Sequence, residues 1–314
     1  MQVDIPFIGK IATEELNDWT SAINSRTDKF KVKPIEAMQQ EQLQKAEVAI
    51  VANPDPDKLK ALTNLKWVQS LWAGVEGLLG SGFNPELTIV RLTDPQMAES
   101  MSEAVLAWTL YLHRKMPQYA TQQSLQQWQQ LSLSAPQECN VSVFGLGKLG
   151  TRAALRLKQN QFTVRGWSNS SKSIDGIETF HGTNGLDSIL PVTDIAIILL
   201  PLTAETTSLF NKRCMNKLPA GASIINFARG PIVVQTDLLE CLNSSQLDHA
   251  VLDVFNEEPL PQNNPLWKHP NVTVLPHISA PTTLSTAASI AAENIDNYLA
   301  SGNIPESVDR SRGY

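Results

Sequence analysis

The stretch Val141–Gly150, V-S-V-F-G-L-G-K-L-G, constrains the fold of this chain more than any other. A β-branched apolar segment runs directly into G-x-G-x-x-G, and an alanine- and leucine-rich helical pattern follows over Thr151–Gln159. In such a turn Gly145 permits the tight bend, Gly147 lets the backbone approach a pyrophosphate, and Gly150 lets helix and strand pack closely. The helix N-terminus adds free N–H groups and a positive dipole end. The order strand, turn, helix therefore predicts a dinucleotide site, whereas the glycines alone would indicate only a turn.

Length and charge narrow the class of protein. The chain has 314 residues, enough for two domains, and a net charge of -6 without a dense run of Lys or Arg, which argues against a nucleic-acid or anionic-membrane surface. The longest strongly apolar run, Ile195–Leu200, is too short to span a bilayer, and Met1–Lys10 is typical of a first strand and not of a signal peptide. Cys139, Cys214 and Cys241 are too widely spaced to suggest a disulfide framework or a metal site. We expect a cytoplasmic protein with no nucleic-acid, membrane or metal partner.

Strand-like and helix-like patterns alternate along the whole chain, which is typical of parallel sheets with helices on both faces. The first series of strands is expected near Val3–Ile8, Phe30–Ile35, Val48–Val51, Val68–Leu71 and Ile89–Arg91, with helices that include Glu14–Asn24 and Asp57–Leu62. The second series begins at Val141 and continues near Phe162–Trp167, Ile195–Leu200, Ser223–Asn226, Ala250–Val254 and Val272–Leu275.

Two long helical patterns separate these series. One runs from about Met97 to Met116, and Pro117 marks its end. A polar segment, Gln118–Gln130, follows and is expected to be surface structure. The last pattern, Thr283–Leu299, ends near Gly302 and is expected to return to the first unit. We therefore expect one domain from residues 1–93 with 284–314, a second from 94–283, and an interdomain cleft that holds the ligands.

Three segments of the second series end in residues whose side chains could take part in catalysis. Arg229 follows one strand in N-F-A-R-G, Glu258 follows the next in L-D-V-F-N-E-E-P-L-P, and His277 follows the third in L-P-H-I. Alone, each has a plain alternative: a surface arginine, a solvated acidic loop, a structural histidine. Together, at the carboxyl edge of a nucleotide-binding sheet, they offer what a ketoacid reductase needs. A guanidinium grips a carboxylate, an imidazole exchanges a proton near neutral pH, and a neighbouring carboxylate orients the imidazolium.

On these motifs, with G-L-G-K-L-G and the ending Val308–Tyr314, the chain resembles the D-isomer-specific 2-hydroxyacid dehydrogenase family over essentially its full length. It is most similar to the glyoxylate/hydroxypyruvate reductase A type. The resemblance implies two doubly wound parallel-sheet α/β domains, a Rossmann nucleotide domain inserted into a flavodoxin-like substrate domain. It also implies that Arg229, Glu258 and His277 are the catalytic residues. In the early segment L-W-A-G-V-E, it implies that Gly74 and Val75 hold the substrate carboxylate through backbone N–H groups, although A-G-V by itself is a common turn.

The residues after the second strand of the nucleotide domain bear on the cofactor. An NAD-selective domain places an Asp there to bind the ribose 2′-OH, but this chain has Ser168, followed by Asn169, Ser170 and, two positions on, Lys172. A 2′-phosphate meets hydroxyls, an amide and a lysine, which favours NADPH. The similar reductases tend to carry arginines in this loop, so NADH stays possible, and Lys172 has a solvated surface lysine as its alternative.

Other cofactor contacts are implied by the resemblance alone. Lys148 and Leu149 offer N–H groups to the pyrophosphate. The nicotinamide side is lined by Leu200, Pro201, Thr206, Phe227, Ala228 and Asp253. Thr206 has a helix cap without ligand contact as its alternative.

These expectations combine into a reductase that transfers hydride from NADPH to small 2-oxoacids, glyoxylate and hydroxypyruvate foremost. A homodimer is expected from the resemblance and from the long helix after Thr93, which otherwise is simply core. One alternative is another dehydrogenase on the same scaffold, including a phosphonate, formate or broader 2-ketoacid enzyme. The other is a non-catalytic NAD(P)H-sensing corepressor, which has little need for the three catalytic side chains together.

Overall fold

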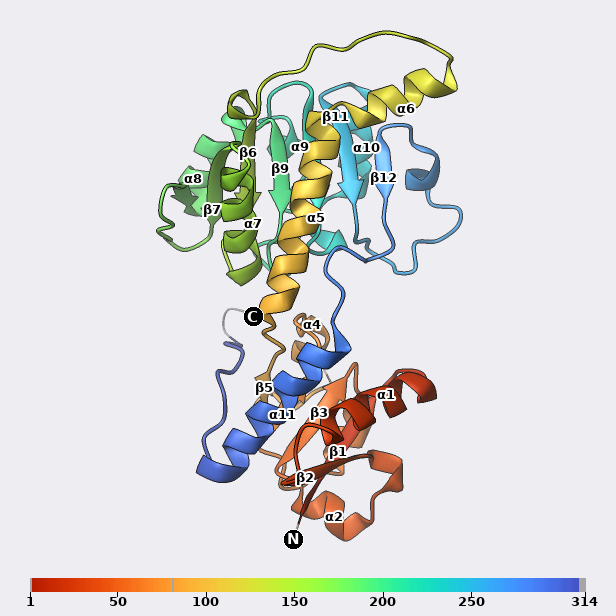
Figure 1. The fold of residues 1–314 in the computed structure, drawn as a ribbon, viewed down its shortest axis with the longest axis vertical. Coiled ribbons are helices and arrows are strands. Elements are labelled where there is room, and N and C mark those ends of the chain that lie inside the picture. The colour runs from red at the N-terminus through yellow and green to blue at the C-terminus, as the bar shows by residue number, and fades with distance from the viewer. Residues whose placement is uncertain (1, 81, 311–314) are drawn as a thin grey trace. The chain divides into compact units, whose positions relative to one another are not determined.

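The computed structural model describes residues 2–80 and 82–310, so the last four residues of the segment Val308–Tyr314 lie outside the described residues. The chain forms two compact units. The first contains Met1–Gln96 and Thr282–Tyr314, and the second contains Met97–Pro281. Both are α/β units built on a parallel sheet, as predicted (Figure 1).

The first unit has a five-stranded sheet in the order β2-β1-β3-β4-β5. This is the flavodoxin-like strand order. Its strands are β1 (Val3–Gly9), β2 (Phe30–Pro34), β3 (Val48–Ala52), β4 (Trp67–Ser70) and β5 (Thr88–Val90). Its helices are α1 (Thr13–Asn24), α2 (Gln40–Lys45), α3 (Pro56–Lys60), α4 (Glu76–Leu79) and α11 (Leu284–Ser301).

Helix α11 belongs to the first unit although it comes last in the sequence. A stripe of small and branched residues on α11 is buried, consisting of Ala287, Ala288, Ala291, Ala292 and Ile295. Asn294 Nδ2 donates to Gln69 Oε1 at 2.8 Å, and the Tyr298 hydroxyl donates to Glu47 Oε2 at 2.8 Å. These contacts complete the first unit with residues from both ends of the chain.

The second unit has a seven-stranded sheet in the order β12-β11-β10-β9-β6-β7-β8. Read from β8, this is the Rossmann order with one more strand at the far edge. Its strands are β6 (Asn140–Phe144), β7 (Thr163–Ser168), β8 (Glu178–His181), β9 (Ile195–Ile198), β10 (Ala222–Asn226), β11 (Leu247–Leu252) and β12 (Val272–Val274). Its helices are α5 (Pro95–His113), which begins at the end of the first unit, α6 (Met116–Ser124), α7 (Lys148–Gln159), α8 (Gly182–Ile189), α9 (Lys212–Met215) and α10 (Gln235–Asn243).

Helices cover both faces of the second sheet, because its strands are apolar on both sides. On one face Val105 of α5 and Leu157 of α7 pack with Val141, Val143 and Ile197 (Figure 1). On the other face, residues of α8, α9 and α10 pack with the alternate side chains of the same strands, a cluster that includes Phe144, Ile189, Ile198, Met215, Ile224 and Leu238. The carboxyl ends of the strands are left for the site.

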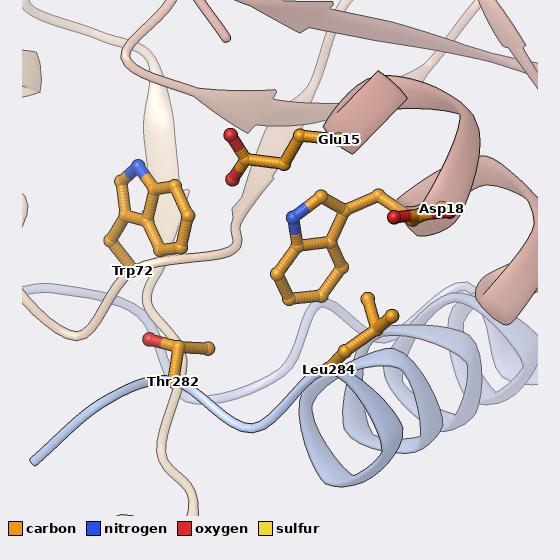
Figure 2. A pocket seen from close by; sticks show the side chains of 6 residues that line it. Glu15, Asp18, Trp72, Thr282 and Leu284 are labelled. Atoms are coloured by element: carbon orange, nitrogen blue, oxygen red, sulfur yellow. The ribbon is translucent and has the colours of Figure 1, made fainter. Parts of the chain in front are cut away.

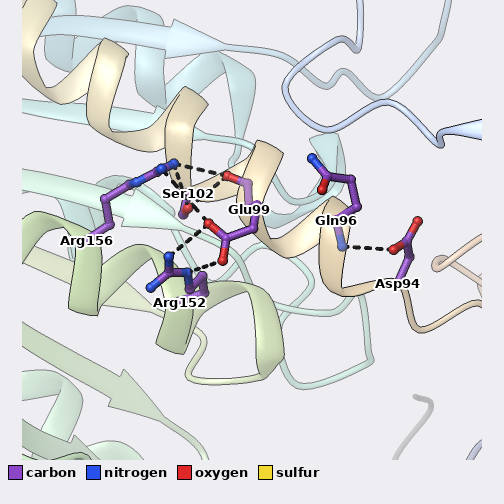
Figure 3. A network of polar contacts seen from close by, with 6 residues as sticks. All are labelled: Asp94, Gln96, Glu99, Ser102, Arg152 and Arg156. Carbon is purple, nitrogen blue, oxygen red and sulfur yellow. Dashed lines mark hydrogen bonds and ion pairs between the residues drawn. The ribbon is translucent and has the colours of Figure 1, made fainter. Parts of the chain in front are cut away.

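A polar network ties the first turns of α5 to α7 on one face of this sheet. Arg152 donates to both carboxylate oxygens of Glu99, at 2.5 and 2.9 Å, and Arg156 Nη1 donates to Ser102 Oγ at 3.0 Å (Figure 3). The Arg152 hydrogen bonds hold the pKa of Glu99 below its usual value. Figure 3 also shows Asp94, whose Oδ1 accepts from the Gln96 N–H at 2.8 Å and so satisfies a donor in the first turn of α5.

Two details differ from the sequence prediction. Helix α5 ends at His113, and Pro117 lies in the first turn of α6, where a proline fits because that N–H has no helical partner. The strand β8 was not predicted, since it is a short edge strand whose one partner among the described strands is β7, and it is at most half-buried. Within residues 2–80 and 82–310, no helix has the length and apolar composition needed to cross a membrane.

Candidate active site

The predicted glycine turn lies where the strand order of the second sheet reverses, between β6 and β9. Gly145 has φ +109, and a Cβ there would lie 2.5 Å from the Leu199 carbonyl oxygen. A Cβ on Gly150 would collide with the Gly145 carbonyl, whereas a Cβ on Gly147 would meet nothing within 4 Å. Gly145 and Gly150 are thus required by the packing of the turn. Gly147 is instead open on its Cα side, as the approach of a ligand to the backbone requires.

Helix α7 begins at this turn with free donors. Its N-cap is Gly147, and no side chain caps it. Among the described residues, the hydrogen bonds of this helix begin at Thr151, whose N–H donates to the Gly147 carbonyl at 2.9 Å. The preceding N–H groups, including those of Lys148, Leu149 and Gly150, are available to an anion. The residues present therefore fit the pyrophosphate of a dinucleotide.

The loop after β7 contains the residues predicted to meet the adenosine ribose. Ser168 is buried and its hydroxyl donates to the Ser170 carbonyl at 2.7 Å, while Lys172 is exposed. Asn169 Nδ2 donates to Glu205 Oε2 at 2.6 Å. The sequence indicated no carboxylate at this place, but Glu205 brings one from the turn after β9. No local pattern signals this contact, because the two residues are 36 positions apart.

The turn after β9 is held together by Thr206. Its hydroxyl donates to the Pro201 carbonyl at 2.6 Å and accepts from the Thr203 N–H at 2.8 Å. The side chain of Thr206 is buried, as is that of Leu200, two residues after the end of β9. Thr206 therefore shapes this turn in the manner of a cap, and any ligand contact would come in addition.

The turn after β10 sets the position of Arg229. Asn226, which is buried, accepts from the Ala228 N–H at 3.1 Å and donates to the Arg229 carbonyl at 3.1 Å. Arg229 Nη1 donates to the Ala228 carbonyl at 2.7 Å. Phe227 and Ala228 are buried between these residues. Asn226 is a positioning residue within N-F-A-R-G whose role the sequence pattern does not predict.

The turns after β10 and β11 pack directly against each other. A Cβ on Gly230 would collide with the Phe255 carbonyl, so only glycine permits this approach. The Asp253 N–H also donates to the Asn226 carbonyl at 3.1 Å. The segment that carries Arg229 is therefore held beside the segment that leads to Glu258.

Glu258 and His277 form a pair at the same edge. His277 Nδ1 lies 2.7 Å from Glu258 Oε2, and the other carboxylate oxygen accepts from the Phe255 N–H at 2.8 Å. The His277 side chain is 54% exposed and the Glu258 side chain is 35% exposed, so a small molecule has access to both. With Nδ1 on the carboxylate, Nε2 is the nitrogen left to exchange a proton with a substrate.

The backbone at His277 is strained and is held by Asp253. His277 has φ +54, a left-handed conformation that is uncommon for a residue other than glycine. Asp253 is only 2% exposed, and its two oxygens accept from the N–H groups of Ile278 at 2.7 Å and Ser279 at 2.9 Å. This carboxylate, which the resemblance placed near the nicotinamide, fixes the backbone that follows His277.

In the first unit, the segment after β4 presents two backbone donors. The Ser70 hydroxyl accepts from the Trp72 N–H at 3.1 Å, and the Leu92 N–H donates to the Trp72 carbonyl at 3.1 Å. The N–H groups of Gly74 and Val75 donate to no other residue in the described parts of the chain. Two fixed, unused donors in succession are suited to a carboxylate.

A recess of about 310 Å³ lies beside this segment, within the first unit (Figure 2). Figure 2 shows the Glu15 carboxylate pointing from α1 toward the Trp72 indole, with Thr282 on the opposite side of the recess. Trp72 packs edge-on against Trp19, with ring centroids 6.0 Å apart. The Trp72 side chain is thus held in place, two positions before Gly74.

Each unit thus gathers the residues that the sequence predicted for it. Arg229, Glu258 and His277 follow the neighbouring strands β10, β11 and β12 and lie at one edge of the second sheet. The described residues contain no group of His, Cys, Asp and Glu side chains that could hold a metal ion. What the sequence did not reveal are the supporting residues Asn226 and Glu205.

Comparisons with known proteins agree with this geometry. Residues 106–279 match a sequence model described as D-isomer specific 2-hydroxyacid dehydrogenase, NAD binding domain. A D-isomer specific 2-hydroxyacid dehydrogenase from Xanthobacter autotrophicus, solved with NADPH, is 34% identical with a TM-score of 0.92, and the match covers 100% of both chains.

Two further structures are similar over the same extent. An NADPH-dependent glyoxylate/hydroxypyruvate reductase from Sinorhizobium meliloti, solved with NADP and sulfate, is 31% identical with a TM-score of 0.90 and full coverage of both chains. A probable 2-hydroxyacid dehydrogenase from Rhizobium etli, solved with NADP, is 30% identical with a TM-score of 0.91, again with full coverage of both chains. With the dinucleotide turn and the Glu258–His277 pair, these matches establish that the chain belongs to the D-isomer specific 2-hydroxyacid dehydrogenase family, a family of NAD(P)-dependent oxidoreductases.

Proposed function

We propose that this protein is an NADPH-preferring reductase of small 2-oxoacids that converts glyoxylate to glycolate and hydroxypyruvate to D-glycerate. The observation that carries the proposal is the 2.7 Å contact of His277 Nδ1 with Glu258, beside the turn that holds Arg229. The similar reductase from Sinorhizobium meliloti, whose name includes these two substrates, supports the choice of substrate.

The binding roles follow from charge and available donors. The N–H groups of Gly74 and Val75, together with the guanidinium of Arg229, are proposed to bind the substrate carboxylate. An arginine is suited to this task because its planar N–H groups match the two carboxylate oxygens. Trp72 is proposed to limit the size of the substituent next to the carbonyl, since its ring is fixed beside this loop.

The turn of Gly145, Gly147 and Gly150 and the N-terminus of α7 would hold the dinucleotide, which would supply the hydride for the carbonyl carbon. Leu200, Pro201 and Phe227 are proposed to line its nicotinamide end. Lys172 is proposed to favour the 2′-phosphate of NADPH, and NADH remains a second cofactor.

The proton comes from His277. Its Nε2 donates to the carbonyl oxygen as negative charge develops there, and Glu258 keeps the ring oriented and compensates the charge of the imidazolium. Arg229 stabilises the same developing charge. The product then has the D configuration wherever it is chiral.

The test is a spectrophotometric assay of the purified chain with glyoxylate, hydroxypyruvate and pyruvate, each with NADPH and with NADH. We expect the highest kcat/KM for glyoxylate or hydroxypyruvate with NADPH. A clear preference for pyruvate or longer 2-oxoacids would replace this proposal by a broader 2-ketoacid dehydrogenase. Tight NADPH binding without turnover of any 2-oxoacid would favour a sensing protein instead.

We also propose that the protein is a cytoplasmic homodimer. Helix α6 and the segment after it expose Met116, Leu125, Leu133 and, at 99%, Trp128. Such apolar side chains are costly to leave in water, and a second copy would cover them. The three cysteines are free thiols, which fits a reducing compartment. Light scattering after size exclusion should give twice the chain mass, and Trp128→Ser should shift the equilibrium toward monomer.

A further inference from the structure

A carboxylate lies at the place where a dinucleotide-binding sheet distinguishes the two cofactors. Strands β7 and β9 flank β6, so the turns that follow them share one edge of the sheet. Asn169 follows β7 directly, and its amide donates to the Glu205 carboxylate at 2.6 Å. Glu205 is thereby held beside the loop of Ser168 and Lys172.

This position has a known chemical meaning in Rossmann domains. An acidic residue after the second strand accepts from the ribose 2′-OH of NAD, and its negative charge repels the 2′-phosphate of NADP. Here the strand itself ends in Ser168, which has no charge. We infer that Glu205, reaching this place from the turn after β9, acts as the missing acid and reduces the preference for NADPH over NADH. The inference rests on the proposed use of NAD(P)H and concerns which of the two binds better.

The charge of Glu205 is not neutralised by its surroundings. Among residues 2–80 and 82–310, Asn169 is its one hydrogen-bond partner and no cation lies within 4.0 Å of it. Lys172, in the same loop, likewise forms no ion pair with a described residue. The loop after β7 and the turn after β9 therefore offer a positive and a negative side chain, respectively, at this edge of the sheet. The expected result is a reductase that accepts both dinucleotides, with Lys172 attracting the 2′-phosphate and Glu205 opposing it.

Dissociation constants of NADPH and NADH, measured by calorimetry on the full chain, test this inference without relying on turnover. Glu205→Gln removes the charge and keeps an oxygen that can accept from Asn169. We expect the Kd of NADPH to fall between about 3- and 10-fold, the Kd of NADH to change by less than about 2-fold, and the difference to shrink at high salt. The matched control is Glu240→Gln, since Glu240 is an exposed acid on α10 that pairs with Lys212; its Kd values should equal those of the wild type.

Two results would overturn the inference. One is an NADPH Kd in Glu205→Gln that is within about 2-fold of the wild-type value. The other is a parallel weakening of both dinucleotides in Glu205→Gln and Glu205→Ala, which would mean that Glu205 only shapes the loop. The proposed function is tested separately. If the Kd values change as expected but the protein reduces no 2-oxoacid, the role of Glu205 stands and the proposed reductase activity is wrong.

Discussion

Two histidines of the second unit, one within β11 and one shortly after β12, lie in opposite environments. His249 lies within β11, is 3% exposed, and its Nε2 lies 2.9 Å from the Thr273 hydroxyl. Its ring also packs edge-on against Tyr111 of α5, with centroids 6.2 Å apart. His277 follows β12, is 54% exposed at its side chain, and faces the carboxylate of Glu258.

The difference shows what makes a histidine useful for proton transfer. Burial disfavours the charged ring and lowers the pKa of His249 to about 4, so this residue is neutral at physiological pH. His277 has solvent access, an anionic partner and a backbone held by Asp253. The interior of the sheet therefore keeps its histidine neutral, whereas the histidine that we propose as the general acid is exposed and paired with a carboxylate.

The largest effect that tests this contrast is expected from His277→Ala. Loss of the general acid should lower kcat by a factor of about 10² to 10⁴, with little change in the Kd of NADPH. The control is His249→Gln, which should retain kcat within about threefold because this residue is remote from the proton transfer. Near-normal turnover in His277→Ala, measured with glyoxylate or hydroxypyruvate, would show that His277 is not the general acid.

The second prediction concerns stability in acid. The pKa of His249 in the folded chain, about 4, is below the value of about 6.5 for an unfolded chain, so the unfolded chain binds the proton first. The stability that neutral His249 confers is complete above pH about 6.5 and is lost as the pH falls toward 4, by up to about 3 kcal/mol. Urea unfolding at several pH values should show a shallower decline in His249→Gln than in the wild type. Equal slopes would mean that His249 is not buried as a neutral ring.

The third prediction removes the charge of the partner of His277. Glu258→Gln keeps an oxygen that can accept from the Phe255 N–H but no longer compensates an imidazolium. We expect kcat to fall about tenfold, because the protonated ring has lost its counter-charge. A kcat of the variant within about twofold of the wild-type value contradicts this role of Glu258.

The smallest effect is expected farther along the same edge, at Lys172. Lys172→Ser should raise the KM for NADPH by about threefold and leave the KM for NADH nearly unchanged, since an exposed lysine contributes little to binding a phosphate. Steady-state kinetics with both cofactors provide the comparison. Equal changes in the KM for NADPH and for NADH would mean that Lys172 is a solvated surface residue that does not contact the 2′-phosphate.

Much of the fold was predictable because its signals are local. The alternation of patterns predicted both parallel sheets, and the run into Gly145 located the dinucleotide turn within a few residues. The edge strand β8 was not predicted because its residues are only half-buried and have a weak apolar pattern. Pro117 was assigned to a helix end although it lies in a first helical turn, since proline is compatible with both positions.

The candidate site could be proposed from the sequence to the extent that its residues follow strands. Arg229, Glu258 and His277 were predicted to lie together because each comes soon after an apolar strand, and parallel strands bring their carboxyl ends to one edge. Asn226 and Asp253 support these residues through hydrogen bonds to backbone, and a sequence does not show which backbone groups need a partner.

The amino-acid sequence by itself determined the family, the two sheets and the three side chains that we propose for catalysis, because each depends on spacing along the chain. Only the tertiary structure decided that His277 is exposed and paired while His249 is buried, and that Glu205 faces the loop after β7. These outcomes depend on which strands become neighbours and on how much solvent is excluded between them. Both are properties of the folded chain, since they join residues that lie far apart in the sequence.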